Sequence, residues 1–367
     1  ASTFRVFGTS EASARLVPAL SGAILVLAVC LLAARLGYRS TGWWVASLVG
    51  LNYVLTHFSR FAMTESTYLL FLFVAFAAFL QSLSERRRFW IVLSGLAFGL
   101  SAMTKGVVAL VFPLAGLLFS LLLMPWIPWC TRARRALPGS GIALANLAIA
   151  SAVGVLVAAP WHVYMVLTQG MPFIHDYFLW NVWERIVSGV DMQKKALGSL
   201  YYMNQLPIRM PFGFMLFLLS LARTAGCIQL ASLFRIPRAA RSRKEVLNDH
   251  PSLPEQRREI AKLLFFSWIG VALAAFSVAQ SKLVQYTPPM VLPALLLAGL
   301  EADRLWRHRS WQRGDLLVLI TPVVLLWAAL APWRLAVKRI AGAAIPSPPD
   351  FALSASVLVV AGLITWS

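Results

Sequence analysis

Long apolar stretches separated by short polar connections are the feature that most constrains this chain. About eleven of them are long enough to cross a bilayer, in which a helix needs roughly 20 apolar residues. They lack the two-residue alternation of a membrane β-barrel, so they predict helices. We therefore expect an all-α, polytopic transmembrane helical bundle that forms a single domain over residues 1–367. The predicted spans are 16–34, 42–57, 67–84, 89–103, 106–127, 141–168, 206–222, 263–279, 286–302, 315–333 and 351–366.

The basic residues indicate how the bundle lies in the membrane. The net charge is +19, which could indicate a nucleic-acid partner. Most of the Lys and Arg, however, stand beside apolar spans, and alternation of the spans places these clusters on one side. Cytoplasmic loops of membrane proteins collect Lys and Arg. We therefore exclude nucleic acid, expect the bilayer as partner, and assign the 223–262 loop, with its nine basic residues, to the cytoplasm. Arg334, Lys338 and Arg339 fit this pattern less well.

The opposite, extracytoplasmic side carries the polar motifs. Its longest loop is 169–205, which is rich in aromatic residues, and an interfacial helix is expected near 172–187. Five short patches lie at the outward ends of spans: FGTSEASARL, HFSRFAMTES, TKG, HDYFLWNVWERI and SKLVQY. The candidate site residues in them are Glu11, Arg60, Glu65, Lys105, His175, Asp176, Arg185, Lys282 and Tyr286.

Each patch also has a purely structural explanation. Glu11 and Arg15 are four residues apart and can pair on a helix. Arg60 can snorkel to the interface, and Glu65 can favour a helix N-terminus by its charge alone. Lys105 and Lys282 can anchor the ends of spans. His175 and Asp176 can be ordinary interfacial residues.

Taken together, the patches predict a chemical site. Arg60, Lys105, Arg185 and Lys282 converge on one side, as binding of a phosphate or pyrophosphate at the membrane surface requires. Neighbouring carboxylates can act as a general base or orient an acceptor. The residues alone therefore predict an outward-facing site for a lipid phosphate.

The order and wording of the patches resemble the bacterial membrane glycosyltransferases that include lipid A aminoarabinose transferase, with protein O-mannosyltransferases as more distant relatives. The resemblance covers about residues 4–300. It implies a glycosyltransferase C-type fold that takes a sugar from a polyprenyl-phosphate donor and passes it to a lipid, glycan or protein acceptor. It also implies a multi-pass protein of the bacterial inner membrane with an extracytoplasmic active face. By position it assigns donor-phosphate binding to Lys105, Arg185, Lys282 and Tyr286, and an acidic role near the site to Glu11 and Glu65.

Three departures from that family matter. The main catalytic acid lies upstream of the FG-x-x-E element, before this chain starts, so we expect the chain to be a fragment that is inactive alone. Glu65 stands where relatives often carry Asp. A His that often precedes the Arg of the fourth patch is replaced here within residues 179–182, so we expect no metal and no cofactor other than the lipid-linked substrate.

Two other classes remain open. A transporter or lipid flippase would place charges within its spans and use broken helices near the bilayer centre. In this sequence the charges gather at span ends, which favours an interfacial enzyme. A non-catalytic scaffold would not need four converging cations.

Overall fold

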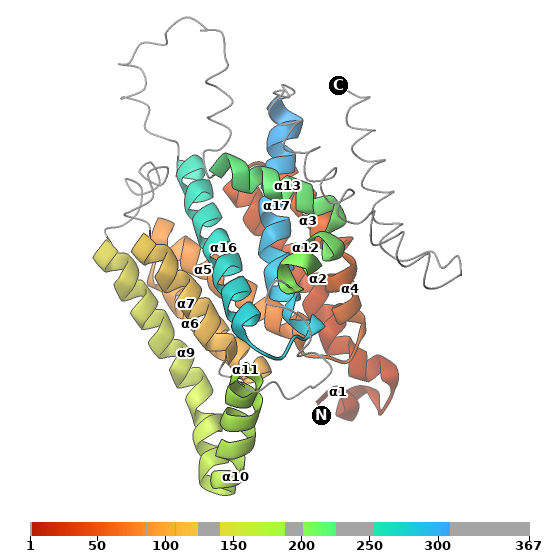
Figure 1. Ribbon diagram of the computed structural model, residues 1–367, viewed down its shortest axis with the longest axis vertical. Coiled ribbons are helices and arrows are strands. Elements are labelled where there is room, and N and C mark those ends of the chain that lie inside the picture. The colour runs from red at the N-terminus through yellow and green to blue at the C-terminus, as the bar shows by residue number, and fades with distance from the viewer. Residues whose placement is uncertain are drawn as a thin grey trace, which may run out of the picture.

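The computed structural model describes residues 2–85, 87–106, 108–123, 140–187, 201–224 and 253–308, and in these ranges all regular structure is helical. The helices form one elongated bundle (Figure 1). They are α1 (Ser2–Phe7), α2 (Glu11–Leu36), α3 (Arg39–Gly50), α4 (Tyr53–Arg60), α5 (Glu65–Glu85), α6 (Arg88–Lys105), α7 (Val108–Leu123), α9 (Ser140–Gln169), α10 (Met171–Ile174), the π-helix η3 (His175–Glu184), α11 (Arg185–Val187), α12 (Tyr201–Arg209), α13 (Pro211–Thr224), α16 (Leu253–Val278), the 3₁₀ turn η6 (Val284–Tyr286) and α17 (Pro288–His308).

The two ends of the bundle carry different residues. Helices α2 and α5 begin at the lower end in Figure 1, and α6, α9 and α16 finish there. Glu65, Lys105 and the 279–287 connection therefore share this end, as the alternation of spans predicts. Arg39, Arg88 and the last turn of α17 lie at the opposite end. We call these the site end and the basic end.

The structure supports a membrane protein without fixing the number of spans. Four helices of the described part are long and apolar enough to cross a membrane, or five if one bent pair counts as a span. The four are α2, α5, α9 from Gly141 and α16 from Arg257. The predictions at 315–333 and 351–366 lie outside the described residues.

Two predicted spans are not straight helices. The span at 42–57 is divided into α3 and α4 by Leu51 and Asn52. Asn52 is buried, accepts a hydrogen bond from Leu55 N at 3.2 Å, and donates one to Arg209 O at 2.8 Å. The span at 206–222 is a bent pair, with an angle of 118° between Tyr201–Arg209 and Gly213–Thr224. Pro207, Pro211 and Gly213 in this stretch remove backbone donors or loosen the chain, which the apolar composition does not reveal.

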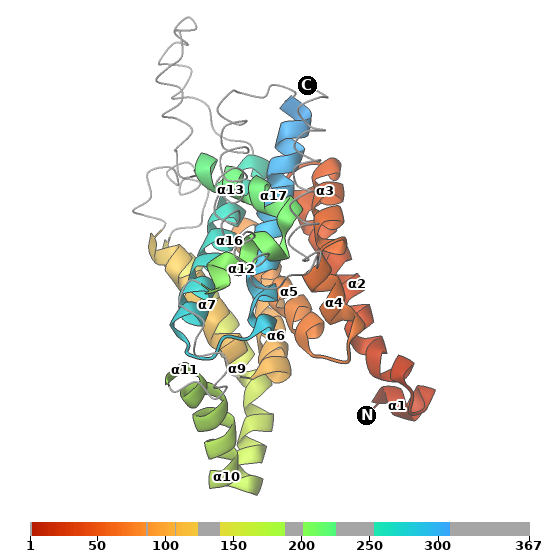
Figure 2. The same cartoon turned by 45° about the vertical axis from the view of Figure 1, so that its right-hand side comes forward.

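The predicted loops are shorter than expected where they are described. The basic connection at 223–262 is helical at both edges, since α13 extends to Thr224 and α16 begins at Leu253. Residues 225–252 and 188–200 lie outside the description. The first part of the 169–205 loop is helical over 171–187, and it runs back beside α9 as the second arm of a hairpin (Figure 2).

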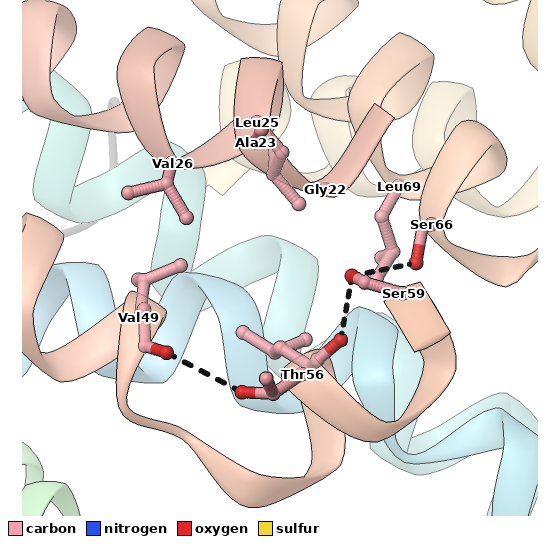
Figure 3. A pocket seen from close by; sticks show the side chains of 11 residues that line it. Gly22, Ala23, Leu25, Val26, Val49, Thr56, Ser59, Ser66 and Leu69 are labelled. Carbon is pink, nitrogen blue, oxygen red and sulfur yellow. Dashed lines mark hydrogen bonds between the residues drawn. The ribbon is translucent and has the colours of Figure 1, made fainter. Parts of the chain in front are cut away.

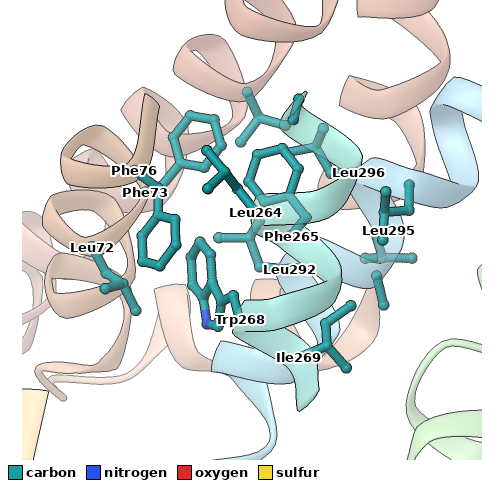
Figure 4. Packing of buried hydrophobic residues seen from close by; sticks show 14 of the residues in the cluster. Leu72, Phe73, Phe76, Leu264, Phe265, Trp268, Ile269, Leu292, Leu295 and Leu296 are labelled. Atoms are coloured by element: carbon teal, nitrogen blue, oxygen red, sulfur yellow. The ribbon is translucent and has the colours of Figure 1, made fainter. Parts of the chain in front are cut away.

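The buried core joins the central helices. Leu72, Phe73 and Phe76 of α5 meet Phe265 and Trp268 of α16 (Figure 4), and the Phe76 and Trp268 rings stack with centroids 4.3 Å apart. Leucines of α17 close this cluster from the other side. Because lipid is as apolar as these side chains, close packing rather than water exclusion stabilises the contact within a membrane.

Polar contacts fasten α17 at the basic end. The buried Asp303 carboxylate accepts hydrogen bonds from Ser40, from Thr41 at 2.6 Å and from Arg307 at 3.0 Å. Glu301 pairs with Arg223 of α13 at 2.6 Å. The acidic residues Glu301 and Asp303 of α17 are thus paired by neighbouring helices and by Arg307 of α17 itself.

Helices α6 and α9 approach closely at glycine. A Cβ atom on Gly99 would lie 2.5 Å from Val157 Cβ and 2.8 Å from Gly154 O, and Gly95 meets Val153 and Ala150 in the same way. This small-residue spacing runs up the interface of two parallel helices. This close contact holds α9 beside the end of α6, near Lys105.

We expect Gly99→Val to lower the free energy of unfolding by about 1–3 kcal/mol, because backbone on the facing helix cannot move away cheaply. Thermal unfolding of the detergent-solubilised protein measures this. Gly141→Val is the control, because a Cβ at Gly141 meets nothing within 4 Å. Equal unfolding temperatures for the two variants would contradict the close contact.

Candidate active site

A buried ion pair marks the site end of the bundle. Glu65, the first residue of α5, and Lys105, the last residue of α6, lie with Oε1 and Nζ 3.1 Å apart. The Glu65 side chain is 8% exposed and that of Lys105 is 21% exposed, so the cation reaches the surface while the carboxylate does not. The pair forms because α5 starts and α6 ends at the same level.

Three of the predicted patches meet at this pair, since Glu65 and Lys105 come from two of them and a third approaches Lys105. Lys105 Nζ lies 3.5 Å from Gln285 O, on the connection that carries Ser281, Lys282 and Tyr286. The ammonium also lies 5.3 Å from the centre of the Tyr68 ring. Gly106 follows with φ of 83°, a left-handed conformation that turns the chain sharply between α6 and α7. Lys105 is therefore held from several sides at a break between helices.

Lys282 has a different environment from the one predicted. Its ammonium donates to Phe276 O at 3.0 Å, Ser277 O at 2.6 Å and Ala279 O at 2.6 Å, and the residue is 4% exposed. The three N–H groups of the ammonium thus donate to three backbone carbonyls at the end of α16. Burial lowers the pKa of Lys282. This geometry is that of a helix C-cap, and it leaves no hydrogen of the ammonium for a phosphate.

Tyr286 is packed on the same connection. Its ring stacks on Phe276 with centroids 4.8 Å apart. Tyr202 of α12 holds the connection in place, accepting from Leu283 N at 2.9 Å and lying 3.2 Å from Leu283 O. The predicted phosphate-binding role of Tyr286 stays a prediction, and its ring is fixed beside the Lys105 contact.

Glu11 and Arg60 lie apart from the ion pair. Glu11 pairs with Arg15, and both side chains are largely exposed. The hydroxyls of Ser21 and Thr67 are 2.9 Å apart, which sets the register of α2 against α5. At 1.5 Å per residue, Glu11 then lies about 12 Å further along the bundle than Glu65. Arg60 is exposed at the end of α4.

The fourth patch forms the returning arm of the hairpin. His175 Nδ1 and Asp176 Oδ1 lie 3.0 Å apart, with side chains 62% and 79% exposed, so they face solvent and each other. The backbone of Arg185 begins α11, and Ile186 O accepts from Gln280 N at 3.1 Å. The arm therefore brings Arg185 into the neighbourhood of the 279–287 connection, whereas His175 and Asp176 lie towards the tip.

The sequence also predicts one cavity lined by Glu11, Arg60, Glu65, Lys105, Arg185 and Lys282, and the cavity that the structure describes is a different one. The cavity in Figure 3 has a volume of about 180 Å³ and lies between α2, α3, α4 and α5. Apolar side chains and the hydroxyls of Thr56, Ser59 and Ser66 line it, and none of the predicted site residues does. Within the described ranges, no three His, Cys, Asp or Glu residues gather in a way that could hold a metal ion.

Four residues at the site were not predicted. Tyr68 and Gln285 contact Lys105, and their only signal in the sequence is their distance of a few residues from Glu65 and Lys282. His162 and Tyr177 join the two arms of the hairpin, with Nε2 and Oη 2.8 Å apart. A polar imidazole within the apolar run of α9 is the signal that could have found the second pair.

The arrangement is suited to stabilising an anion. Lys105 is a partly exposed cation whose position is fixed by a buried carboxylate and a helix break. A cation held in place before reaction counts for more in partly dry surroundings than in water. Glu65 is occupied by Lys105, so its geometry fits an orienting role better than that of a proton acceptor.

Several known proteins are similar to this chain in sequence and in fold. Residues 2–175 match the family of dolichyl-phosphate-mannose-protein mannosyltransferases. The undecaprenyl phosphate-alpha-4-amino-4-deoxy-L-arabinose arabinosyl transferase of Enterobacter sp. strain 638 is 26% identical over 342 residues, covering 90% of this chain and 54% of that protein. A second transferase of this name, from Pseudomonas fluorescens strain Pf0-1, is 27% identical over 307 residues, covering 82% of this chain and 48% of that protein.

The structural similarity extends over nearly the whole chain. The crystal structure of ArnT from Cupriavidus metallidurans bound to undecaprenyl phosphate has a TM-score of 0.59 and 20% identity, and the match covers 99% of this chain and 59% of that one. The chain spans about half the length of the curated relatives it matches. In its helical fold and the order of its motifs, the chain is similar to the aminoarabinose transferases, and its first half matches the family of protein mannosyltransferases.

Proposed function

We propose that this protein transfers a sugar from a polyprenyl-phosphate donor to a lipid, glycan or protein acceptor on the extracytoplasmic face of the bacterial inner membrane. The observation that carries the proposal is the Lys105–Glu65 pair at the site end, where α5, α6 and the 279–287 connection meet. Relatives named for transfer of an undecaprenyl phosphate-linked amino sugar support this donor class.

The chemistry assigns a clear role to Lys105. In the transfer, the bond between the anomeric carbon and the donor phosphate oxygen breaks, and the acceptor oxygen forms a new bond to that carbon. The acceptor proton passes to a base, and the lipid phosphate leaves with added negative charge. Lys105 stabilises that charge, and Glu65 keeps the ammonium charged and aimed. The backbone position of Arg185 near Gln280 supports its predicted part in holding the same phosphate.

Transfer in membranes tests the proposal. Membranes that contain the intact protein are supplied with undecaprenyl phosphate-linked 4-amino-4-deoxy-L-arabinose and with other polyprenyl-phosphate sugars. Mass spectrometry then follows the sugar into the lipid, glycan and protein fractions. Failure to transfer from every donor of this class would overturn the proposal. Movement of the intact donor across sealed vesicles without transfer would favour the flippase alternative.

The sidedness of the loops is a separate prediction. We expect the 223–262 connection to face the cytoplasm and the 169–205 segment to face the other side, because Lys and Arg collect in cytoplasmic loops. In a variant with Cys30, Cys130 and Cys227 replaced by Ala, Ser188→Cys should react with a membrane-impermeant maleimide in intact spheroplasts. Ser242→Cys should react only after lysis. The reverse pattern would overturn the orientation and the extracytoplasmic site with it.

A further inference from the structure

The hairpin of α9 and η3 is closed by a hydrogen bond that the proposed reaction does not use. His162 Nδ1 lies 2.8 Å from Ala158 O, and a carbonyl oxygen can only accept, so Nδ1 carries a hydrogen. In the neutral ring Nε2 is then the acceptor. Tyr177 Oη, 2.8 Å away, donates to it. The helix backbone thus fixes the tautomer that receives the tyrosine.

The Tyr177 ring is held as firmly as its hydroxyl. It stacks on Phe173 with centroids 4.9 Å apart, and it meets the edges of Trp161 and Phe178. Tyr177 is therefore packed between the two arms of the hairpin, and its hydroxyl has one defined direction.

The Tyr177 hydroxyl lies at the end of α6 that carries Lys105. A Cβ atom on Gly106 would lie 3.0 Å from Tyr177 Oη, so the hydroxyl rests against the residue that follows Lys105. At its other end, the arm is tied to the 279–287 connection by the hydrogen bond from Gln280 N to Ile186 O. The segment between these two attachments, residues 177–186, includes the backbone of Arg185.

We propose that His162 and Tyr177 are positioning residues that fix this segment against the end of α6, and so set the spacing between Lys105 and the segment that carries Arg185. Neither residue touches the reacting atoms. The inference rests on the proposed function, because the spacing matters only if both elements hold one donor phosphate. A π-helix of ten residues supports it, since such helices are rare and concentrate at functional sites.

Tyr177→Phe tests the His162–Tyr177 hydrogen bond with the smallest change, because it keeps the ring and removes the hydroxyl. We expect the KM for the polyprenyl-phosphate donor to rise about 3- to 10-fold, as for loss of one neutral hydrogen bond, with kcat within about twofold of wild type. Hydrogen exchange of residues 175–187 should become faster. His162→Phe should repeat both effects, and His162→Gln, whose amide can still accept from Tyr177, should restore part of the donor affinity.

Tyr164→Phe is the matched control. Tyr164 lies on the same hairpin, is 62% exposed, and should leave the KM and the exchange rates unchanged. A purely structural role for Tyr177 would lower the yield of folded protein without changing the donor KM. An unchanged donor KM in Tyr177→Phe would therefore overturn the proposal.

Binding of undecaprenyl phosphate alone separates this inference from the proposed function. If the wild-type protein binds this probe but transfers no sugar, the proposed function fails. The ratio of the Kd of Tyr177→Phe to that of the wild type then tests the positioning role of the His162–Tyr177 hydrogen bond. A 3- to 10-fold weaker Kd supports it. An unchanged Kd, or unchanged hydrogen exchange, overturns it.

Discussion

Lys105→Ala in the intact protein is expected to lower the rate of sugar transfer about 100- to 1,000-fold, the usual effect of removing one donor to a developing anion. The leaving phosphate gains charge in the transition state, and Lys105 is a cation of the site end that stays partly exposed while held by Glu65. Initial rates at saturating and limiting donor measure the effect. The loss should appear in kcat as well as in kcat/KM, because the contact strengthens in the transition state.

Two further variants define the role of Lys105. Lys105→Arg should recover only part of the activity, since a planar guanidinium does not reproduce the point contact of an ammonium. Lys262→Ala is the matched control. Lys262 also pairs with a carboxylate, Glu259 at 2.8 Å, but belongs to the half of α16 nearer the basic end. Near wild-type transfer by Lys105→Ala, or an equal loss in Lys262→Ala, would remove Lys105 from the site.

Lys282→Ala is expected to destabilise the protein by about 3 kcal/mol, because it leaves three carbonyls at the end of α16, two buried and one partly buried, without their charged donor. Unfolding in detergent, followed by thermal and chemical denaturation, measures this. The sequence alone predicts another result, in which Lys282→Ala and Arg185→Ala both abolish transfer and leave folding intact. For Arg185 that expectation stays a prediction, whereas for Lys282 the three carbonyl contacts lead us to expect a loss of stability instead.

The two explanations of Lys282 differ in one measurable respect. If Lys282 acts only as a helix cap, the activity of Lys282→Ala falls in proportion to the fraction of protein that is folded. The protein that remains folded then keeps the wild-type KM for the donor. Ser281→Ala, next in the chain and equally buried, is the control for perturbing the connection. Unchanged stability together with abolished transfer would show that the ammonium leaves its carbonyls to bind phosphate.

Much of the architecture could be predicted from local sequence patterns. Runs of apolar residues require helices in a membrane, because every backbone group must be satisfied within the segment. Alternation of those runs with basic clusters placed Glu65, Lys105 and the Ser281–Tyr286 stretch at one end. The predicted helix bounds at 67–84 and 89–103 agree with α5 and α6 to within a few residues. The resemblance in motif order agrees with the family model and the relatives that this chain matches.

The sequence by itself thus determined the helical membrane fold, the separation of basic and chemical ends, and the Lys105 and Glu65 patches. Only the tertiary structure decided which residues meet. The division of one span at Asn52 depends on a carbonyl of α12, and the contact of Lys105 with Gln285 joins residues 180 positions apart. Likewise, Lys282 caps its own helix, and Tyr177 reaches His162 and Gly106. Hydropathy and charge fix where a segment lies along the membrane normal, but the rotation and register of packed helices determine which side chains on one level touch.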